Sequence, residues 1–147
     1  MTRKRTNRKD RLTCYLGKNL KMNPEVYALR RQVMDVIYKA KELVPELPRL
    51  DVRIIEGNRH NILGVAQSGD CVIWIPENSL TNNVEFLPHV VLHEICHAVW
   101  SAPHDNDCPL MSPYLNLGEP PMTWEQLSEA FLGAYQRCSS VNLREAG

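Results

Sequence analysis

The chain has 147 residues, of which 44% are hydrophobic and 23% are charged, and its formal net charge is zero. These values are typical of a globular protein with a single hydrophobic core. No apolar run approaches the ~18 residues that span a bilayer, and the N-terminus lacks the apolar region of a secretory signal. We therefore expect a cytoplasmic protein without a membrane span.

The positive charge is concentrated at the N-terminus. Residues 1–11 contain six Lys or Arg and one acid, whereas the rest of the chain is acidic. Since no aromatic residues are interspersed, we expect a flexible, solvated tail over residues 1–22 rather than a contact with nucleic acid. A single domain should follow over residues 23–140, with a short C-terminal tail over 141–147. The five cysteines form no CxxC pair and are expected to be free thiols.

Hydrophobic periodicity predicts the remaining elements in chain order. An amphipathic helix should begin after a cap at Asn23 and end before Pro45. Three short strands are predicted over residues 50–56, 61–67 and 71–77, with a hairpin turn between the last two. A second helix is expected over 82–100, an ordered loop over 101–122, and a third helix over 123–138 that starts with a capping box at Thr123 and Gln126. The fold class is therefore α+β, with a small mixed sheet packed against helices.

The second predicted helix carries an HExxH motif made of His93, Glu94 and His97. Residues four apart lie on one face of a helix, so both imidazoles can point at one metal ion. Glu94 is turned by about 100° from His93, which places its carboxylate beside the open coordination position. Two histidines suit zinc, and a catalytic zinc site needs a third protein ligand besides its water. The motif thus predicts one zinc ion per chain.

The third ligand is open at this stage, with His104 and Glu129 as candidates. His104 follows the helix after a short turn, and Glu129 lies on the third predicted helix. His89 is one turn before His93, but a straight helix cannot wrap three such residues around one tetrahedral ion. We interpret His89 as a capping or outer-shell residue and His60 as a surface residue.

The segment HEICHAVWSAPHDNDCPLMSPYL, residues 93–115, resembles the metzincin metalloproteases. Their signature is HExxHxxGxxH followed by a methionine-containing turn, and the matrixin-like form places a proline before the third histidine. The order of helices and strands is also similar over about residues 24–138. The resemblance implies a zincin fold with a backing helix, an active-site helix and a C-terminal helix.

The resemblance also implies an activity and a set of site residues. The protein would be a zinc metalloendopeptidase acting on a peptide or protein substrate. His93, His97 and His104 would bind zinc, and Glu94 would be the general base that activates the zinc-bound water. Met111 would form the apolar floor beneath the metal. Two further assignments are outer-shell Asp105 and an edge strand at about residues 71–75 that would bind the substrate backbone.

The sequence departs from the family pattern between the second and third histidines. Six residues separate His97 from His104, where the family has five, and the family glycine is absent from the region of Trp100 and Ser101. That glycine lets the chain leave the helix in a left-handed conformation. Two alternatives therefore stand beside the metzincin interpretation. One is a gluzincin-like hydrolase with Glu129 as third ligand, and the other is a zinc-stabilised interaction or assembly protein without catalysis.

Overall fold

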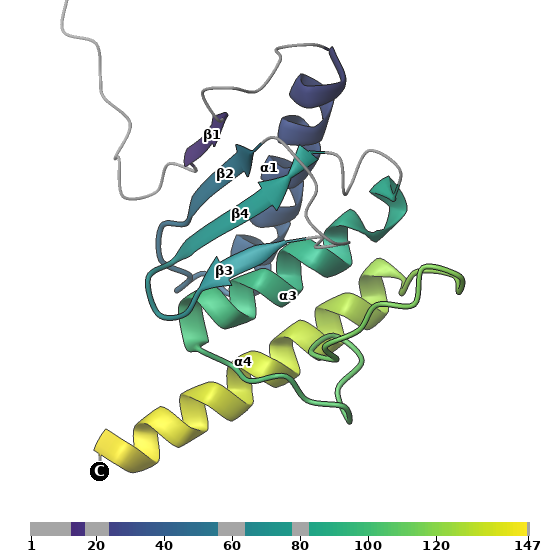
Figure 1. The fold of residues 1–147 in the computed structure, drawn as a ribbon. Helices are drawn as coiled ribbons and strands as arrows, with labels where there is room; N and C mark the ends of the chain where they lie inside the picture. The colour runs from purple at the N-terminus through teal and green to yellow at the C-terminus, as the bar shows by residue number, and fades with distance from the viewer. Residues whose placement is uncertain (1–12, 17–23, 56–63, 78–82, 147) are drawn as a thin grey trace, which may run out of the picture.

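The computed structural model describes residues 13–16, 24–55, 64–77 and 83–146. Within these ranges the chain is a mixed α+β domain, as predicted (Figure 1). The sheet has the strand order β1–β2–β4–β3. Its parallel strands are β1 (Thr13–Leu16), β2 (Asp51–Ile55) and β4 (Val72–Pro76), and β3 (Val65–Gln67) runs antiparallel to β4 at one edge.

The helices are α1 (Pro24–Leu43), α3 (Leu87–Trp100) and α4 (Trp124–Ala146), with a 3-10 turn, η2 (Val84–Phe86), leading into α3. α3 occupies the centre of the molecule and contacts α1, β3, β4 and α4 (Figure 1). None of the helices within the described ranges is long and apolar enough to cross a membrane.

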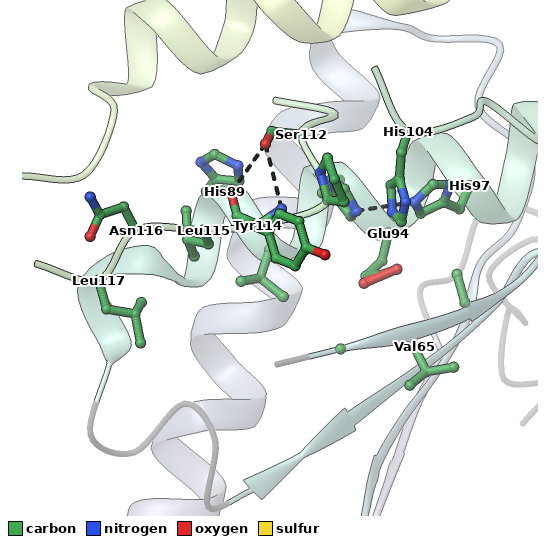
Figure 2. A pocket seen from close by; sticks show the side chains of 15 residues that line it. Val65, His89, Glu94, His97, His104, Ser112, Tyr114, Leu115, Asn116 and Leu117 are labelled. Carbon is green, nitrogen blue, oxygen red and sulfur yellow. Dashed lines mark hydrogen bonds between the residues drawn. The ribbon is translucent and has the colours of Figure 1, made fainter. Parts of the chain in front are cut away.

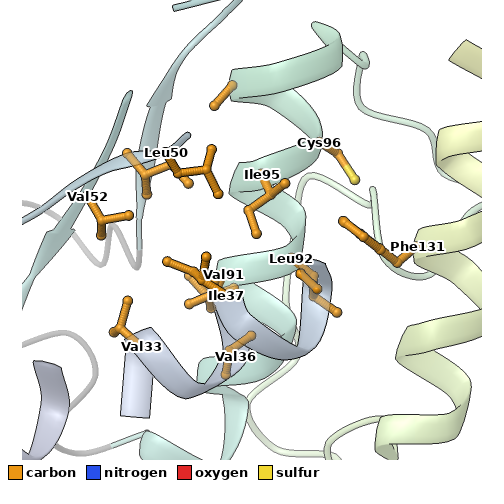
Figure 3. Close-up of a cluster of buried hydrophobic side chains, with 14 of the residues drawn as sticks. Val33, Val36, Ile37, Leu50, Val52, Val91, Leu92, Ile95, Cys96 and Phe131 are labelled. Atoms are coloured by element: carbon orange, nitrogen blue, oxygen red, sulfur yellow. The ribbon is translucent and has the colours of Figure 1, made fainter. Parts of the chain in front are cut away.

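The core explains why α3 is apolar on nearly every side. Val91 and Ile95 point toward α1 and the sheet, whereas Leu92 and Cys96 point toward Phe131 of α4 (Figure 3). All five side chains are fully buried. A helix packed on two sides must be hydrophobic around most of its circumference, which leaves only a narrow polar face for the HExxH motif. The four cysteines with described side chains, Cys71, Cys96, Cys108 and Cys138, are free.

Regular structure is present within both segments that were expected to be tails. Thr13–Leu16 form β1, which pairs in parallel with β2 from Asp51 to Ile54. The strand covers the edge of β2 that faces away from β4. This pairing is non-local, and the charge pattern of residues 1–11 gives no indication of it. At the other end α4 continues to Ala146, through the predicted tail. No Pro or Gly interrupts that segment before Gly147.

The prediction of the edge strand was wrong. Residues 72–76 form β4, an interior strand between β2 and β3, and among the described strands the edge on this side of the sheet is β3. The chain reverses at Gly69, which has a φ of +80°, and Cys71 also has a positive φ of 58°. This reversal pairs β3 with β4, and β3 lies beside α3. The predicted cap Asn23, His60 and residues 61–63 of the predicted second strand lie outside the described residues.

Candidate metal centre

A cleft of about 1000 Å³ lies between β3 and the later part of the loop that joins α3 to α4, and α3 forms its floor (Figure 2). β3 contributes Val65 and Ala66, and residues 112–117 form the opposite wall. His93 and His97 reach the cleft from α3, one turn apart on the same face, as the motif predicts. The polar face of an otherwise buried helix therefore opens into this cleft.

Ser101 ends α3 in the left-handed conformation, with φ 52° and ψ 33°. Its amide donates to the carbonyl of His97 at 3.1 Å, and the amide of Ala102 donates to the carbonyl of Cys96 at 3.1 Å. The first of these bonds is that of an αL helix cap, which usually has glycine at the left-handed position. A serine thus takes the conformation that the absent glycine would have taken, and the chain turns so that His104 comes back over the cleft.

The imidazoles of His93, His97 and His104 converge. One ring nitrogen of each lies within 4.8 Å of one nitrogen of each of the others. The ring centroid of His104 is 4.7 Å from that of His97 and 5.3 Å from that of His93. In the part of the chain that the structure describes, no other three His, Cys, Asp or Glu side chains meet this criterion.

Backbone carbonyls hold the two helical histidines in one tautomer. His93 Nδ1 lies 2.7 Å from the carbonyl oxygen of Leu110, and His97 Nδ1 lies 2.6 Å from that of Ala102. Because a carbonyl can only accept, each Nδ1 carries the proton and each Nε2 of a neutral ring carries a lone pair. Burial lowers the pKa of His93 to about 4 and also lowers that of His97, so both rings are neutral near pH 7.

Two lone pairs therefore face each other in this site. The Nε2 atoms of His93 and His97 are 3.0 Å apart, and between neutral rings in these tautomers the contact is not a hydrogen bond. Such a contact is unfavourable unless a cation lies between the nitrogens. Two nitrogens bound tetrahedrally to zinc would be roughly 3.3 Å apart, given Zn–N distances of about 2.0–2.1 Å. The observed separation fits a shared metal ion.

Glu94 projects from α3 into the same cleft, where its side chain lies close to Gly64 at the start of β3. Its side chain is 7% exposed, and burial raises its pKa to about 7. Gly64 passes so close that a Cβ atom there would lie 3.0 Å from Glu94 Cγ and 3.1 Å from Oε2. The absence of a side chain at Gly64 is thus what lets β3 approach the carboxyl group. Sequence reasoning did not identify this glycine.

The other predicted site residues lie outside the cleft. Met111 is buried beside a smaller cavity with Trp100, and its backbone carbonyl accepts a hydrogen bond from the amide of Asp105 at 2.9 Å. The Asp105 carboxylate accepts from the Asp107 amide at 2.9 Å, so it shapes the loop and the predicted outer-shell contact with a histidine is not seen. The ring partners are backbone carbonyls instead. Glu129 lines a separate pocket between the loop and α4, away from the histidines.

His89 was interpreted as a capping or outer-shell residue, and the capping role is not seen. It lies on the cleft wall, is 8% exposed and makes no cap hydrogen bond. Its spacing of four residues before His93 puts it on the cleft face of α3, and this signal was available in the sequence.

No protein-family model matches the chain, and no curated protein matches it.

Proposed function

We propose that the chain is a zinc-dependent metallopeptidase of metzincin type. The observation that carries this proposal is the 3.0 Å separation between the Nε2 atoms of His93 and His97, with His104 beside them. A buried carboxyl group, Glu94, lies in the same open cleft. Metal-assisted peptide hydrolysis requires metal ligands, a general base close to them and a cleft that can hold a peptide substrate.

The residues fit zinc in both number and kind. His93, His97 and His104 would supply three nitrogen ligands, and the carbonyls of Leu110 and Ala102 would orient two of the rings from behind. When bound, zinc would polarise the scissile carbonyl and make the attacking water more acidic. The placement of Glu129 in a separate pocket argues against the gluzincin-like alternative.

Glu94 would move the proton during hydrolysis. Its carboxylate would accept a proton from water as the water oxygen bonds to the carbonyl carbon. It would then give that proton to the nitrogen of the breaking C–N bond, so that an amine leaves. The outer edge of β3 would align an extended substrate by adding it as a further strand, because β4 is the partner of β3 among the described strands.

The test begins with metal content. We expect one zinc per wild-type chain by elemental analysis, a large loss in His104→Ala, and no loss in the matched control Glu129→Ala. Glu94→Gln should keep its zinc and lose roughly 10²–10⁴-fold in peptide turnover. Full turnover in zinc-loaded Glu94→Gln would refute the mechanism. Stoichiometric zinc without cleavage of diverse peptides would favour the non-catalytic assembly protein.

A further inference from the structure

The stretch of chain that builds the cleft contains no basic residue. Residues 60–136 hold nine of the seventeen Asp and Glu residues of the chain and none of its seventeen Lys and Arg residues. The floor and both walls of the cleft are built entirely from this stretch. A surface whose charge serves solubility alone usually carries both signs interspersed. The exclusion of bases therefore points to a role in what approaches the cleft.

Four basic side chains lie on the far side of α3 from the cleft. They belong to α1 and are Arg30, Arg31, Lys39 and Lys41. The residues of α3 that point toward α1 include Val91 and Ile95 (Figure 3). Each is two residues from His93, which is about 200° of helix rotation, so α1 lies behind α3 as seen from the histidines. Arg137 on α4 lines two smaller cavities rather than the cleft.

Acidic side chains flank the cleft on both walls. Asp70 follows β3, and its carboxylate accepts a hydrogen bond from the side chain of Gln67 in that strand. On the opposite wall the amide of Glu119 donates to the carbonyl of Asn116 at 3.3 Å, and Asn116 lines the cleft. Both acids are exposed, and neither forms an ion pair within the described part of the chain. Their charges therefore act on whatever approaches the cleft.

The interior of the cleft differs from its surroundings. No Lys, Arg or Asp lines it, and its one carboxyl group is Glu94, which the proposed mechanism uses. A charged substrate side chain buried there would lose its hydration without gaining a counter-ion. An extended chain advances about 3.3 Å per residue, so residues a few positions from the reacting carbonyl leave this interior and come under the acidic side chains. The cleft thus suits an uncharged stretch at its centre and cationic side chains toward its ends.

We propose that the substrate is a cationic polypeptide segment, in which Lys or Arg residues flank an uncharged stretch at the scissile bond. This inference rests on the proposed peptidase function and names its substrate class. The negative charge around the cleft would attract such a segment and raise its association rate, an effect of about 10- to 10³-fold at low ionic strength. A segment with acidic flanks would be repelled.

The test uses three peptide hydroxamates that share an uncharged core, whose hydroxamate chelates the metal, and differ only in flanking Lys, Gln or Glu residues. Calorimetry measures their affinities for zinc-loaded wild type at about 0.01 M and about 1 M salt, where the Debye length is about 30 Å and about 3 Å. At low salt we expect the Lys ligand to bind about tenfold more tightly than the Glu ligand, and at high salt we expect similar affinities. The charge of bound zinc alone would produce the reverse order.

Two matched double variants locate the effect. Asp70→Asn with Glu119→Gln removes two charges beside the cleft and should reduce the Lys-to-Glu affinity ratio several-fold, whereas the control, Glu25→Gln with Glu42→Gln on α1, should leave it near the wild-type value. Equal effects of the two variants would overturn the inference, because the attraction would then come from net charge alone.

The remaining outcomes separate this inference from the proposed function. Binding of all three ligands with equal affinity at low salt, or tightest binding of the Glu ligand, would overturn the inference and leave the metal site supported. If none of the ligands binds, the metal site and the inference are refuted together. A Lys preference without cleavage of any peptide in a random mixture would refute the peptidase function and leave a protein that binds cationic segments.

Discussion

Replacing Glu94 by Gln should stabilise the metal-free protein at neutral pH. The carboxyl group is 7% exposed, and burial raises its pKa from the ordinary 4.5 to about 7. The folded state therefore binds the proton more tightly than the unfolded state does. Stability is greatest below the unfolded pKa and falls as the pH rises from 4.5 to about 7. At about 1.4 kcal/mol per pKa unit, the loss reaches about 3 kcal/mol above that window, and glutamine removes it.

Urea unfolding of both proteins in a chelating buffer, at about pH 5 and about pH 8, measures this effect. His93 and His97 act in the opposite direction because burial lowers their pKa values. Their contribution is present at high pH and is lost as the pH falls, but it is common to both proteins and cancels in the difference. Added zinc should shrink the difference, since a nearby cation favours the carboxylate. Equal stabilities of the metal-free proteins at about pH 8 would refute the reasoning.

Three further predictions concern the elements that shape the site. Ser101→Gly should raise the free energy of unfolding by roughly 1 kcal/mol, because the left-handed conformation at φ 52° strains serine but not glycine; an unchanged urea midpoint would contradict this. Gly64→Ala should lower peptide turnover and stability, the latter by about 1–3 kcal/mol, because the new Cβ would lie 3.0 Å from Glu94 Cγ. Its control is Gly133→Ala on α4, where the nearest atom is the mobile end of Arg137 at 3.4 Å, and a wild-type kcat in Gly64→Ala would count against the close approach. A chelator should lower the Tm of the wild type but leave that of His104→Ala unchanged, as scanning calorimetry would show; equal shifts would mean that His104 is not a ligand.

Local patterns in the sequence were sufficient for the helices and for the placement of the motif. The capping box at the start of α4 is confirmed, because the Thr123 amide donates to Gln126 Oε1 at 3.0 Å and the Gln126 amide donates to Thr123 Oγ1 at 3.2 Å. Helix periodicity also put His93 and His97 on one face. Such features depend on residues three or four apart, and their physics is contained within one segment.

The features that the sequence could not supply depend on backbone groups or on distant segments. The carbonyls of Leu110 and Ala102 orient the imidazoles, and a carbonyl leaves no trace in the residue type. β1 is joined to the sheet by parallel pairing across more than thirty residues, for which charge patterning carries no information. The edge position of β3 likewise follows from the pairing of β4, which has β2 on one side and β3 on the other. The pairing of β1 with β2 depends on segments far apart in the sequence, whereas the carbonyl contacts depend on the path of the backbone.

The loop after α3 contacts all three candidate metal ligands, so metal binding should affect the stability of this loop. It carries His104, and its carbonyls at Ala102 and Leu110 accept hydrogen bonds from the rings of the other two candidate ligands. A cation at the Nε2 atoms would favour neutral rings protonated at Nδ1, the form that donates to these carbonyls. The core around Phe131, by contrast, is formed by buried hydrophobic side chains. Metal should therefore stabilise the loop and the cleft, while the hydrophobic core maintains the fold in its absence.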